Sequence, residues 1–239
     1  MSTRWAAVGA LADGWWRGFA MNGAEVADEH RAGTRDEVIA ALEAGALRVV
    51  EIGGGAARVP APVLPEAGLM IGGLDQDAPR DRLPGWARLG ISGFLAMRQH
   101  WDGIVCVVME KASFWVQVSA DEVVSFQGFM TPRLIAELGG GAEIDERALS
   151  ESLSRPERLA ALLRSAEVAG DAGATTASLI GAELAASRPY WLGQAVGVIA
   201  DAGPYPGAVA AQGMTPECEA WNSVLHRGLT AAAIRFGLD

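Results

Sequence analysis

The stretch Val107–Val118, VVMEKASFWVQV, contains two apolar runs separated by a short polar interruption. Both runs are rich in the β-branched and aromatic residues that are typical of strands, and Glu110-Lys111-Ala112-Ser113 lies between them. Two strand-like runs that are joined by so few residues predict a hairpin. The interruption has two interpretations, a plain turn or a loop that is shaped to fit a ligand.

This hairpin begins a series of three strand-like runs, IVCVVM, FWVQV and EVVSFQGF, between residues 104 and 129. An earlier series in residues 5–32 contains the turn signals Asp13-Gly14 and Asn22-Gly23, which predict three antiparallel strands. A helix follows each series. Thr34 and Glu37 have the spacing of a capping box, and Thr131 has the place of an N-cap before Pro132.

Each helical region leads to another strand-like run, ALRVVEIGGG in the first half and AVGVIAD in the second. The order strand-strand-strand-helix-strand therefore occurs twice, starting near residues 5 and 103. It predicts an α/β protein with two duplicated mixed-sheet domains, residues 1–100 and 101–239. The last helix is expected to open at Thr215-Pro216, and packing back onto the first domain is one arrangement open to it.

Two finer predictions concern residues between these elements. Ser154 and Glu157 have the spacing of another capping box. The glycine-rich IGGGAARV (residues 52–59) lacks the pattern of a dinucleotide or phosphate loop, so we expect an ordinary loop there.

Bulk properties exclude several classes of partner. The chain has 239 residues, of which 50% are hydrophobic, so it is long enough for one large domain or two small ones. Its net charge of −10, without a basic run, makes nucleic acid and anionic membranes poor partners. No secretory signal or long uninterrupted apolar run is visible, and the two cysteines lie far apart, so we expect a cytoplasmic protein. The three histidines lack zinc-site spacing, and no metal site is predicted.

Several segments resemble, in order, the 2-dehydro-3-deoxygalactonokinase (2-keto-3-deoxygalactonokinase) family of sugar-acid kinases. The clearest is SLIGAELAASR (Ser178–Arg188), which is close to a C-terminal helix motif of that family. FWVQV resembles a strand that the family writes with Lys-Trp-Val, and FMTPRL (Phe129–Leu134) resembles its Phe-Met-Thr-Gly-Glu-Leu. WWRGFAMNGAEVADEHRAG resembles its second and third strands, with Arg17 matching an arginine of the first motif.

The resemblance implies the actin-like, sugar-kinase (ribonuclease H-like) fold, in which two lobes close over a cleft. That cleft holds ATP, Mg and the sugar acid, and the turn between the first two strands of each lobe approaches the phosphates. The resemblance therefore implies ATP and Mg as cofactors and a small sugar acid as partner.

Both turns depart from the family pattern. The family has Pro-Gly-Thr-His-Ser-Lys where this chain has residues 109–114, so Glu110 replaces a glycine and only Ser113 matches. The family has Asp-Trp-Gly-Thr-Thr where this chain has residues 10–14, so the first carboxylate is missing from its place and the hydroxyls are missing as well. In FMTPRL, Pro132-Arg133 stands where the family motif has Gly-Glu. Because phosphoryl transfer depends on positioning and on charge neutralisation, these departures predict weak or no kinase activity.

The candidate ligand-binding residues are Asp13, Arg17, Lys111, Ser113, Thr131 and Arg133, and we assign no catalytic residue and no metal ligand. Several of them also have a structural interpretation: Asp13 as a turn residue, residues 110–113 as a solvated hairpin tip, Thr131 as an N-cap and Arg133 as a solvated side chain. Glu183, beside an apolar stripe, is expected to be a partly exposed helical carboxylate.

Three functions remain open at this point. The first is a kinase-family protein with degraded phosphate loops, a pseudokinase candidate that binds a sugar acid, another small anion or a protein. The second is an active kinase for a 2-keto-3-deoxy sugar acid, and the third is a non-catalytic interaction protein. A homodimer surface formed by Trp5, Trp221, Phe236 and Leu238 is also a candidate, although core packing would explain these residues equally well.

Overall fold

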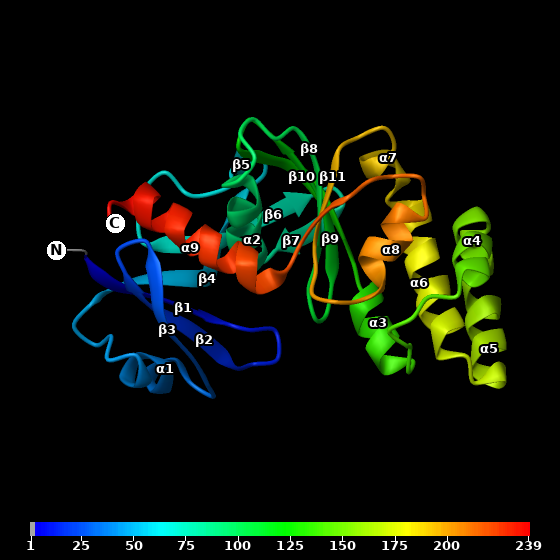
Figure 1. Cartoon of the computed structure of the whole chain (residues 1–239), viewed down its shortest axis with the longest axis horizontal. Coiled ribbons are helices and arrows are strands. Elements are labelled where there is room, and N and C mark those ends of the chain that lie inside the picture. The colour runs from blue at the N-terminus through cyan, green and yellow to red at the C-terminus, as the bar shows by residue number, and fades with distance from the viewer. Residues whose placement is uncertain (1–2) are drawn as a thin grey trace. The chain divides into compact units, whose positions relative to one another are not determined.

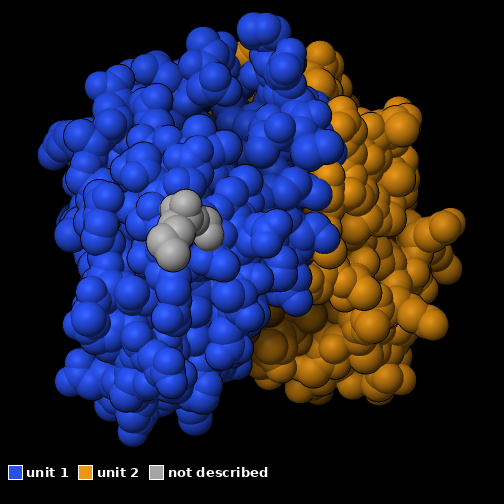
Figure 2. Space-filling model, turned by 60° about the vertical axis from the view of Figure 1, so that its left-hand side comes forward, with its two compact units in different colours: residues 1–101, 118–125, 221–239 blue, residues 102–117, 126–220 orange. Residues whose placement is uncertain are grey.

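A computed structural model describes residues 3–239. The chain forms two compact units, coloured separately in Figure 2. Unit 1 consists of residues 1–101, 118–125 and 221–239, and unit 2 consists of residues 102–117 and 126–220.

The sheet of unit 1 is mixed and has the strand order β3-β2-β1-β4-β6-β7. Its strands are β1 (Arg4–Ala10), β2 (Trp16–Asn22), β3 (Glu25–Ala32), β4 (Arg48–Arg58), β6 (Met70–Asp77) and β7 (Arg80–Leu83). The first three strands run antiparallel, as the turn signals predict, and β4 and β6 continue the sheet in parallel. The short strand β5 (Ala61–Pro62) pairs antiparallel with Glu122 and Val123 at the start of β10 (Glu122–Phe129).

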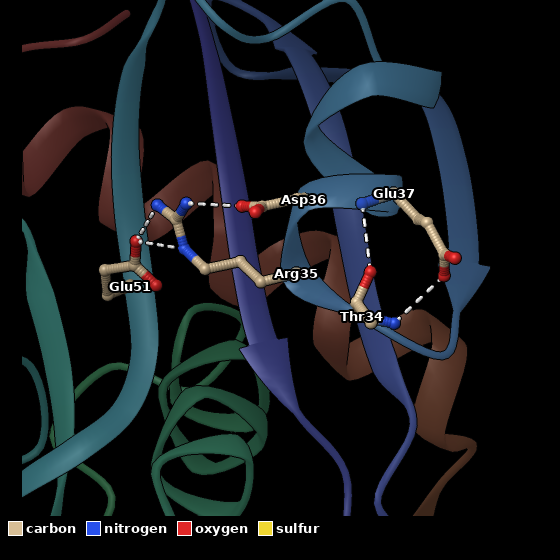
Figure 3. A network of polar contacts seen from close by, with 5 residues as sticks. All are labelled: Thr34, Arg35, Asp36, Glu37 and Glu51. Atoms are coloured by element: carbon tan, nitrogen blue, oxygen red, sulfur yellow. Dashed lines mark hydrogen bonds and ion pairs between the residues drawn. The ribbon is translucent and has the colours of Figure 1, made fainter.

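Helix α1 (Arg35–Ala41) begins at the predicted capping box. The Thr34 hydroxyl accepts from the Glu37 backbone N–H, and the Glu37 carboxylate accepts from the Thr34 N–H, so both exposed amides are satisfied (Figure 3). From the same turn Arg35 reaches across to β4 and pairs with Glu51, with Nε and Oε1 3.0 Å apart. The ion pair and the capping box together fix the start of α1 against the sheet. Val38 is the buried residue of this helix.

Helices α2 (Gly85–Leu95) and α9 (Trp221–Phe236) pack closely together in unit 1 (Figure 1). Glycine makes this possible, because a Cβ at Gly93 would lie 1.8 Å from the Val224 carbonyl oxygen and a Cβ at Gly228 would lie 2.3 Å from that of Leu89. The last helix opens at Trp221, so the prediction of a start at Thr215-Pro216 is wrong. The residues in between form β12 (Glu217–Glu219).

Unit 2 is built around a second mixed sheet with β8 (Gly103–Val108), β9 (Ser113–Ser119), β10, β11 (Val196–Ile199) and β12, in the order β12-β11-β8-β9-β10. Its helices are α3 (Thr131–Glu137), α4 (Glu146–Ser154), α5 (Leu159–Ala169), α6 (Ala172–Ala186), α7 (Arg188–Trp191) and α8 (Pro204–Ala210), with a short 3-10 turn at Pro156–Arg158. The core of this unit joins Trp115 of β9, Ile180 of α6 and Tyr205 of α8.

The two sheets repeat one strand order. In each sheet the first three strands lie side by side in chain order. The next strand along the sheet pairs in parallel with the first of them, β4 with β1 and β11 with β8. The predicted α/β fold with a duplicated mixed-sheet unit is therefore confirmed. No helix within residues 3–239 is long and apolar enough to cross a membrane.

Two local predictions are wrong. Ser154 ends α4 and Glu157 lies in the 3-10 turn, so they form no capping box, and the caps of α4 and α6 are Asp145 and Asp171. Most of IGGGAARV belongs to β4, where the pairing register shifts between Ile52 and Ala56. Trp5 and Leu238 are fully buried in unit 1, which agrees with the core-packing interpretation of these two residues.

Candidate functional site

The β1–β2 turn of unit 1 is closed by its own hydrogen bonds. The Leu11 N–H donates to the Trp15 carbonyl at 2.7 Å, and the Gly14 N–H donates to the Leu11 carbonyl at 3.1 Å. The Trp15 N–H donates to Asp13 Oδ1 at 3.0 Å. Gly14 has a φ of 90°, which a glycine adopts without strain and which makes the turn this tight. These three amides are consequently engaged within the turn.

Asp13, predicted as a ligand or turn residue, has two structural partners. Its second oxygen, Oδ2, forms an ion pair with Arg31 on β3. The Arg31 guanidinium also lies 5.5 Å from the ring of Trp15, which is 48% exposed. The carboxylate therefore ties the turn to the neighbouring strand.

Arg17 on β2 is committed to contacts within unit 1 as well. Its Nε donates to Glu29 Oε1 at 2.7 Å, and its Nη2 donates to Asn222 Oδ1 at 3.1 Å at the start of α9. Its guanidinium lies 4.9 Å from the centre of the Phe19 ring. Arg17 thus joins two strands and the last helix.

The β8–β9 turn of unit 2 is a tight hairpin. The Met109 N–H donates to the Ala112 carbonyl at 2.9 Å, which leaves Glu110 and Lys111 exposed at the tip. Ser113 follows directly, but it is fully buried and begins β9. The interruption in VVMEKASFWVQV is therefore a turn at its tip and part of a buried polar cluster at its end.

That cluster is centred on the Glu183 carboxylate of α6, which is 3% exposed. Oε1 accepts from the Ser113 hydroxyl at 2.8 Å and from the Trp115 indole N–H at 2.9 Å. Oε2 accepts from the Tyr205 hydroxyl at 2.9 Å, and the Thr131 side chain forms a further hydrogen bond with the carboxylate. We call these five residues the Glu183 cluster.

Burial sets the electrostatics of the cluster. Desolvation raises the pKa of Glu183, although the bonds from Thr131, Trp115, Ser113 and Tyr205 act in the opposite direction because they favour the carboxylate. Burial, and then the nearby Glu183, raise the pKa values of Tyr205 and Cys106 well above their ordinary values. Four donors that converge on one buried acid tie β9, α3, α6 and α8 together.

The structure brings two of the six predicted site residues together, Ser113 and Thr131. Thr131 is no N-cap, because Met130 has that place and the Thr131 side chain is turned to Glu183. Arg133 lies on the exposed side of α3, where its Nε donates to Glu137 Oε1 at 2.7 Å. The expectation that Glu183 is partly exposed is wrong, because its helix is covered on that side by β9 and α8.

Sequence reasoning missed Tyr205 and the role of Glu183. One local signal existed: Ser113 and Trp115 are two residues apart on a strand, so both side chains point to the same face. The others lie 22 to 70 positions from their partners along the chain, and no spacing rule connects them. Three of the segments that carry the family resemblance nevertheless meet here, namely FWVQV with the preceding serine, FMTPRL and SLIGAELAASR.

A hydrated magnesium–triphosphate group fits the described turns poorly. No group of three or more His, Cys, Asp or Glu side chains within residues 3–239 is placed to hold a metal ion. The one carboxylate in the β1–β2 turn, Asp13, faces Arg31. Because Asp13 is paired with Arg31, we assign no residue of the β1–β2 turn to magnesium.

Two units with the same strand order define the class of this protein, the fold shared by sugar kinases and actin-like ATPases. The chain is similar to the crystal structure of a candidate 2-dehydro-3-deoxygalactonokinase from Sinorhizobium meliloti, with a TM-score of 0.78 and 21% identity over 96% of this chain and 98% of that one. It is also similar to the activator of 2-hydroxyisocaproyl-CoA dehydratase from Clostridium difficile, solved with bound ADPNP, with a TM-score of 0.51 and 13% identity over 99% and 95%.

No protein-family model matches the chain, and no curated protein matches it. The likeness to the Sinorhizobium meliloti structure agrees with the resemblance seen in the sequence and establishes the fold.

Proposed function

We propose that this protein is a sugar-kinase-fold protein of sugar-acid metabolism that binds a small sugar acid and transfers phosphate weakly or not at all. The sugar-acid part of the proposal rests on the sequence resemblance to 2-dehydro-3-deoxygalactonokinases and on the similarity in fold. The loss of phosphoryl transfer rests on one observation, the self-closed β1–β2 turn of unit 1.

Phosphoryl transfer needs donors that are free to stabilise phosphate charge. In the β1–β2 turn, the amides of Leu11, Gly14 and Trp15 donate to acceptors of the turn itself. Each missing donor of this kind costs a reaction about 3–4 kcal/mol of transition-state stabilisation. The turn also carries the Asp13 carboxylate, which would repel a phosphate.

Two cationic candidates, Arg17 and Arg133, also support weak or absent phosphoryl transfer. Arg17 is paired with Glu29 and Arg133 with Glu137, so an incoming phosphate would compete with a carboxylate at each of them. Exposed pairs are individually weak, at about 0–1 kcal/mol. Their presence still places a negative charge beside each cation, which is the reverse of what a phosphate site requires.

A phosphoryl-transfer assay tests the proposal. The full chain is incubated with ATP, magnesium and 2-keto-3-deoxygalactonate, and phosphorylated product is measured by mass spectrometry. We expect a rate at least about 1,000-fold below the 1–100 s⁻¹ that is typical of kinases.

The variant Asp13→Asn tests whether any activity depends on this carboxylate. In the proposed protein Asp13 has no metal to hold, so the substitution leaves any trace rate unchanged. Turnover of about one per second by the wild-type chain, abolished by Asp13→Asn, would instead show an active kinase that uses this carboxylate.

A further inference from the structure

An open cavity of about 670 Å³ lies in unit 1 beside the glycine-rich part of β4. The register shift between Ile52 and Ala56 forms an irregularity there, and Gly53 and Gly54 have φ values of 101° and 84°. Irregularities of this kind are frequent next to binding sites because they redirect a strand. The cavity volume is within the range of about 300–1,000 Å³ that is usual for small-molecule sites.

Arg88 of α2 lines this cavity although it is only 4% exposed. Its guanidinium donates to three backbone carbonyls: Nε to Val63 at 2.7 Å, Nη1 to Gly72 at 3.1 Å and Nη2 to Pro62 at 2.7 Å. These bonds hold the segment around β5 against β6 and α2. They account for the burial of the side chain, but each acceptor is neutral.

The charge of Arg88 consequently has no ion-pair partner in the described part of the chain. No carboxylate within residues 3–239 lies within 4.0 Å of its nitrogens. Burial without a carboxylate lowers the pKa of Arg88 to about 10. Buried charges are ordinarily paired, because desolvation of an unpaired ion costs several kcal/mol.

The other walls of the cavity suit a small polar molecule. Small residues leave room next to the guanidinium; they are Gly55, Ala56, Ala57, Ala61 and Gly72. Glu66 and Glu122 also line the cavity and are exposed. A ligand therefore meets a buried cation at one place and hydrogen-bond acceptors at another.

We propose that this cavity is a binding site for a small hydroxylated carboxylate, with the carboxylate at Arg88 and the hydroxyls at Glu66 and Glu122. Carboxylates are the natural partners of guanidinium groups, and each terminal nitrogen of Arg88 retains a second hydrogen beyond its carbonyl bond. A simple dianion is disfavoured by the two glutamates, whereas hydroxyl groups donate to them. This inference deepens the proposed function, on which it rests, by giving the sugar acid a location in unit 1.

The test narrows the cavity by a substitution in its wall and leaves Arg88 unchanged. A Cβ at Gly55 would meet only Met70 Sδ within 4 Å, at 3.9 Å, and both residues line the cavity, so the valine of Gly55→Val is expected to take up cavity space. Gly45→Val is the matched control, because a Cβ at exposed Gly45 meets nothing within 4 Å and neither glycine has a positive φ. Calorimetry of each full-length protein is carried out with 2-keto-3-deoxygalactonate, with galactose and with inorganic phosphate.

We expect 2-keto-3-deoxygalactonate to bind the wild-type chain and the Gly45→Val variant equally, and the Gly55→Val variant at least 10-fold more weakly. Galactose, which lacks the carboxylate, and phosphate, which lacks the hydroxyls, should each bind at least 10-fold more weakly than the sugar acid. The double variant Glu66→Gln, Glu122→Gln should bind the sugar acid more weakly than the wild-type chain does. It should bind phosphate at least as tightly as the wild-type chain does.

Sugar-acid binding that is unchanged by Gly55→Val would overturn the cavity as the site while leaving the proposed function in place. Phosphate binding as tight as that of the sugar acid would overturn the assignment of a hydroxylated ligand. Formation of phosphorylated product at a kinase rate would contradict the proposed function, and the comparison of Gly55→Val with Gly45→Val would still decide the location of the acid.

Discussion

At the scale of single residues, Glu183 is a buried polar group that hydrogen bonds hold on both carboxylate oxygens. Its carboxylate accepts hydrogen bonds from donors on three other elements, and burial makes each of those bonds stronger than it would be in water. Removal of the acceptor would leave buried donors without partners, which costs about 1–3 kcal/mol for each group.

We predict that Glu183→Gln lowers the free energy of unfolding by about 1–3 kcal/mol at neutral pH. The amide keeps the shape of the side chain, but its NH₂ group faces a donor instead of accepting from it. Urea unfolding followed by circular dichroism measures the effect. Glu137→Gln, at an exposed helical carboxylate that pairs with Arg133, is the control and should change stability by less than about 0.5 kcal/mol.

The raised pKa of Glu183 also predicts the sign of a pH effect. A carboxyl group whose folded pKa lies above its unfolded value of about 4.5 binds its proton more tightly in the native state. Its contribution to stability is therefore complete below pH 4.5 and is lost as the pH rises through the folded pKa. The stability difference between wild type and Glu183→Gln should narrow as the pH rises above 4.5. A difference that widens instead would contradict the direction of the shift.

At the scale of elements, the pairing of α2 with α9 depends on backbone contact through glycine. A Cβ at Gly93 would lie 1.8 Å from the Val224 carbonyl oxygen, and backbone cannot move aside as a flexible side chain can. Because α9 is the C-terminal helix, this contact joins the end of the chain to the residues of unit 1 that precede Trp101.

Gly93→Ala should therefore destabilise the protein by about 1–3 kcal/mol, even though alanine has the higher helix propensity. Thermal unfolding of the variant is compared with that of Gly45→Ala, where the added methyl group meets nothing within 4 Å. Equal melting temperatures for the two variants would contradict this prediction, because they would mean that α2 and α9 can move apart without loss of stability.

The sequence predicts many of the helices and strands of this fold, because their caps and turns depend on residues that are close together in the chain. Thr34 and Glu37 form their capping box within one turn, and Asp13-Gly14 closes its hairpin locally. The bulge in β4 was not predictable, since a glycine run has no side-chain periodicity to reveal a strand. The last helix was placed too early because Thr215-Pro216 has a helix-start pattern, whereas pairing of Glu217–Glu219 with β11 prevails.

The sites were less predictable than the elements. Ser113 and Thr131 are named by the sequence, but their common partner Glu183 resembles any surface glutamate beside an apolar stripe. Arg88 lies in an ordinary helix, and its burial becomes visible only when the acceptors Pro62, Val63 and Gly72 are placed around it. Such contacts arise from tertiary packing, which no local pattern encodes.

At the scale of the whole molecule, two units repeat the strand order of sugar kinases and actin-like ATPases, and their first turns differ in chemistry from the family pattern. In unit 1 the turn is closed by its own amides and by Asp13 with Arg31. In unit 2 the tip carries Glu110 and Lys111, and the matching serine is buried under Glu183. The two units have the fold of the class, and we propose that its phosphate chemistry is lost.

Hydrogen exchange of the full chain with and without ATP and magnesium tests this proposed loss most directly, because it follows the turn amides themselves. We predict that saturating ATP and magnesium leave the exchange rates of residues 11–15 and 109–113 unchanged within a factor of about two. Strong protection of the Leu11, Gly14 and Trp15 amides on addition of ATP would show that the turn opens to receive phosphate, and it would contradict the account.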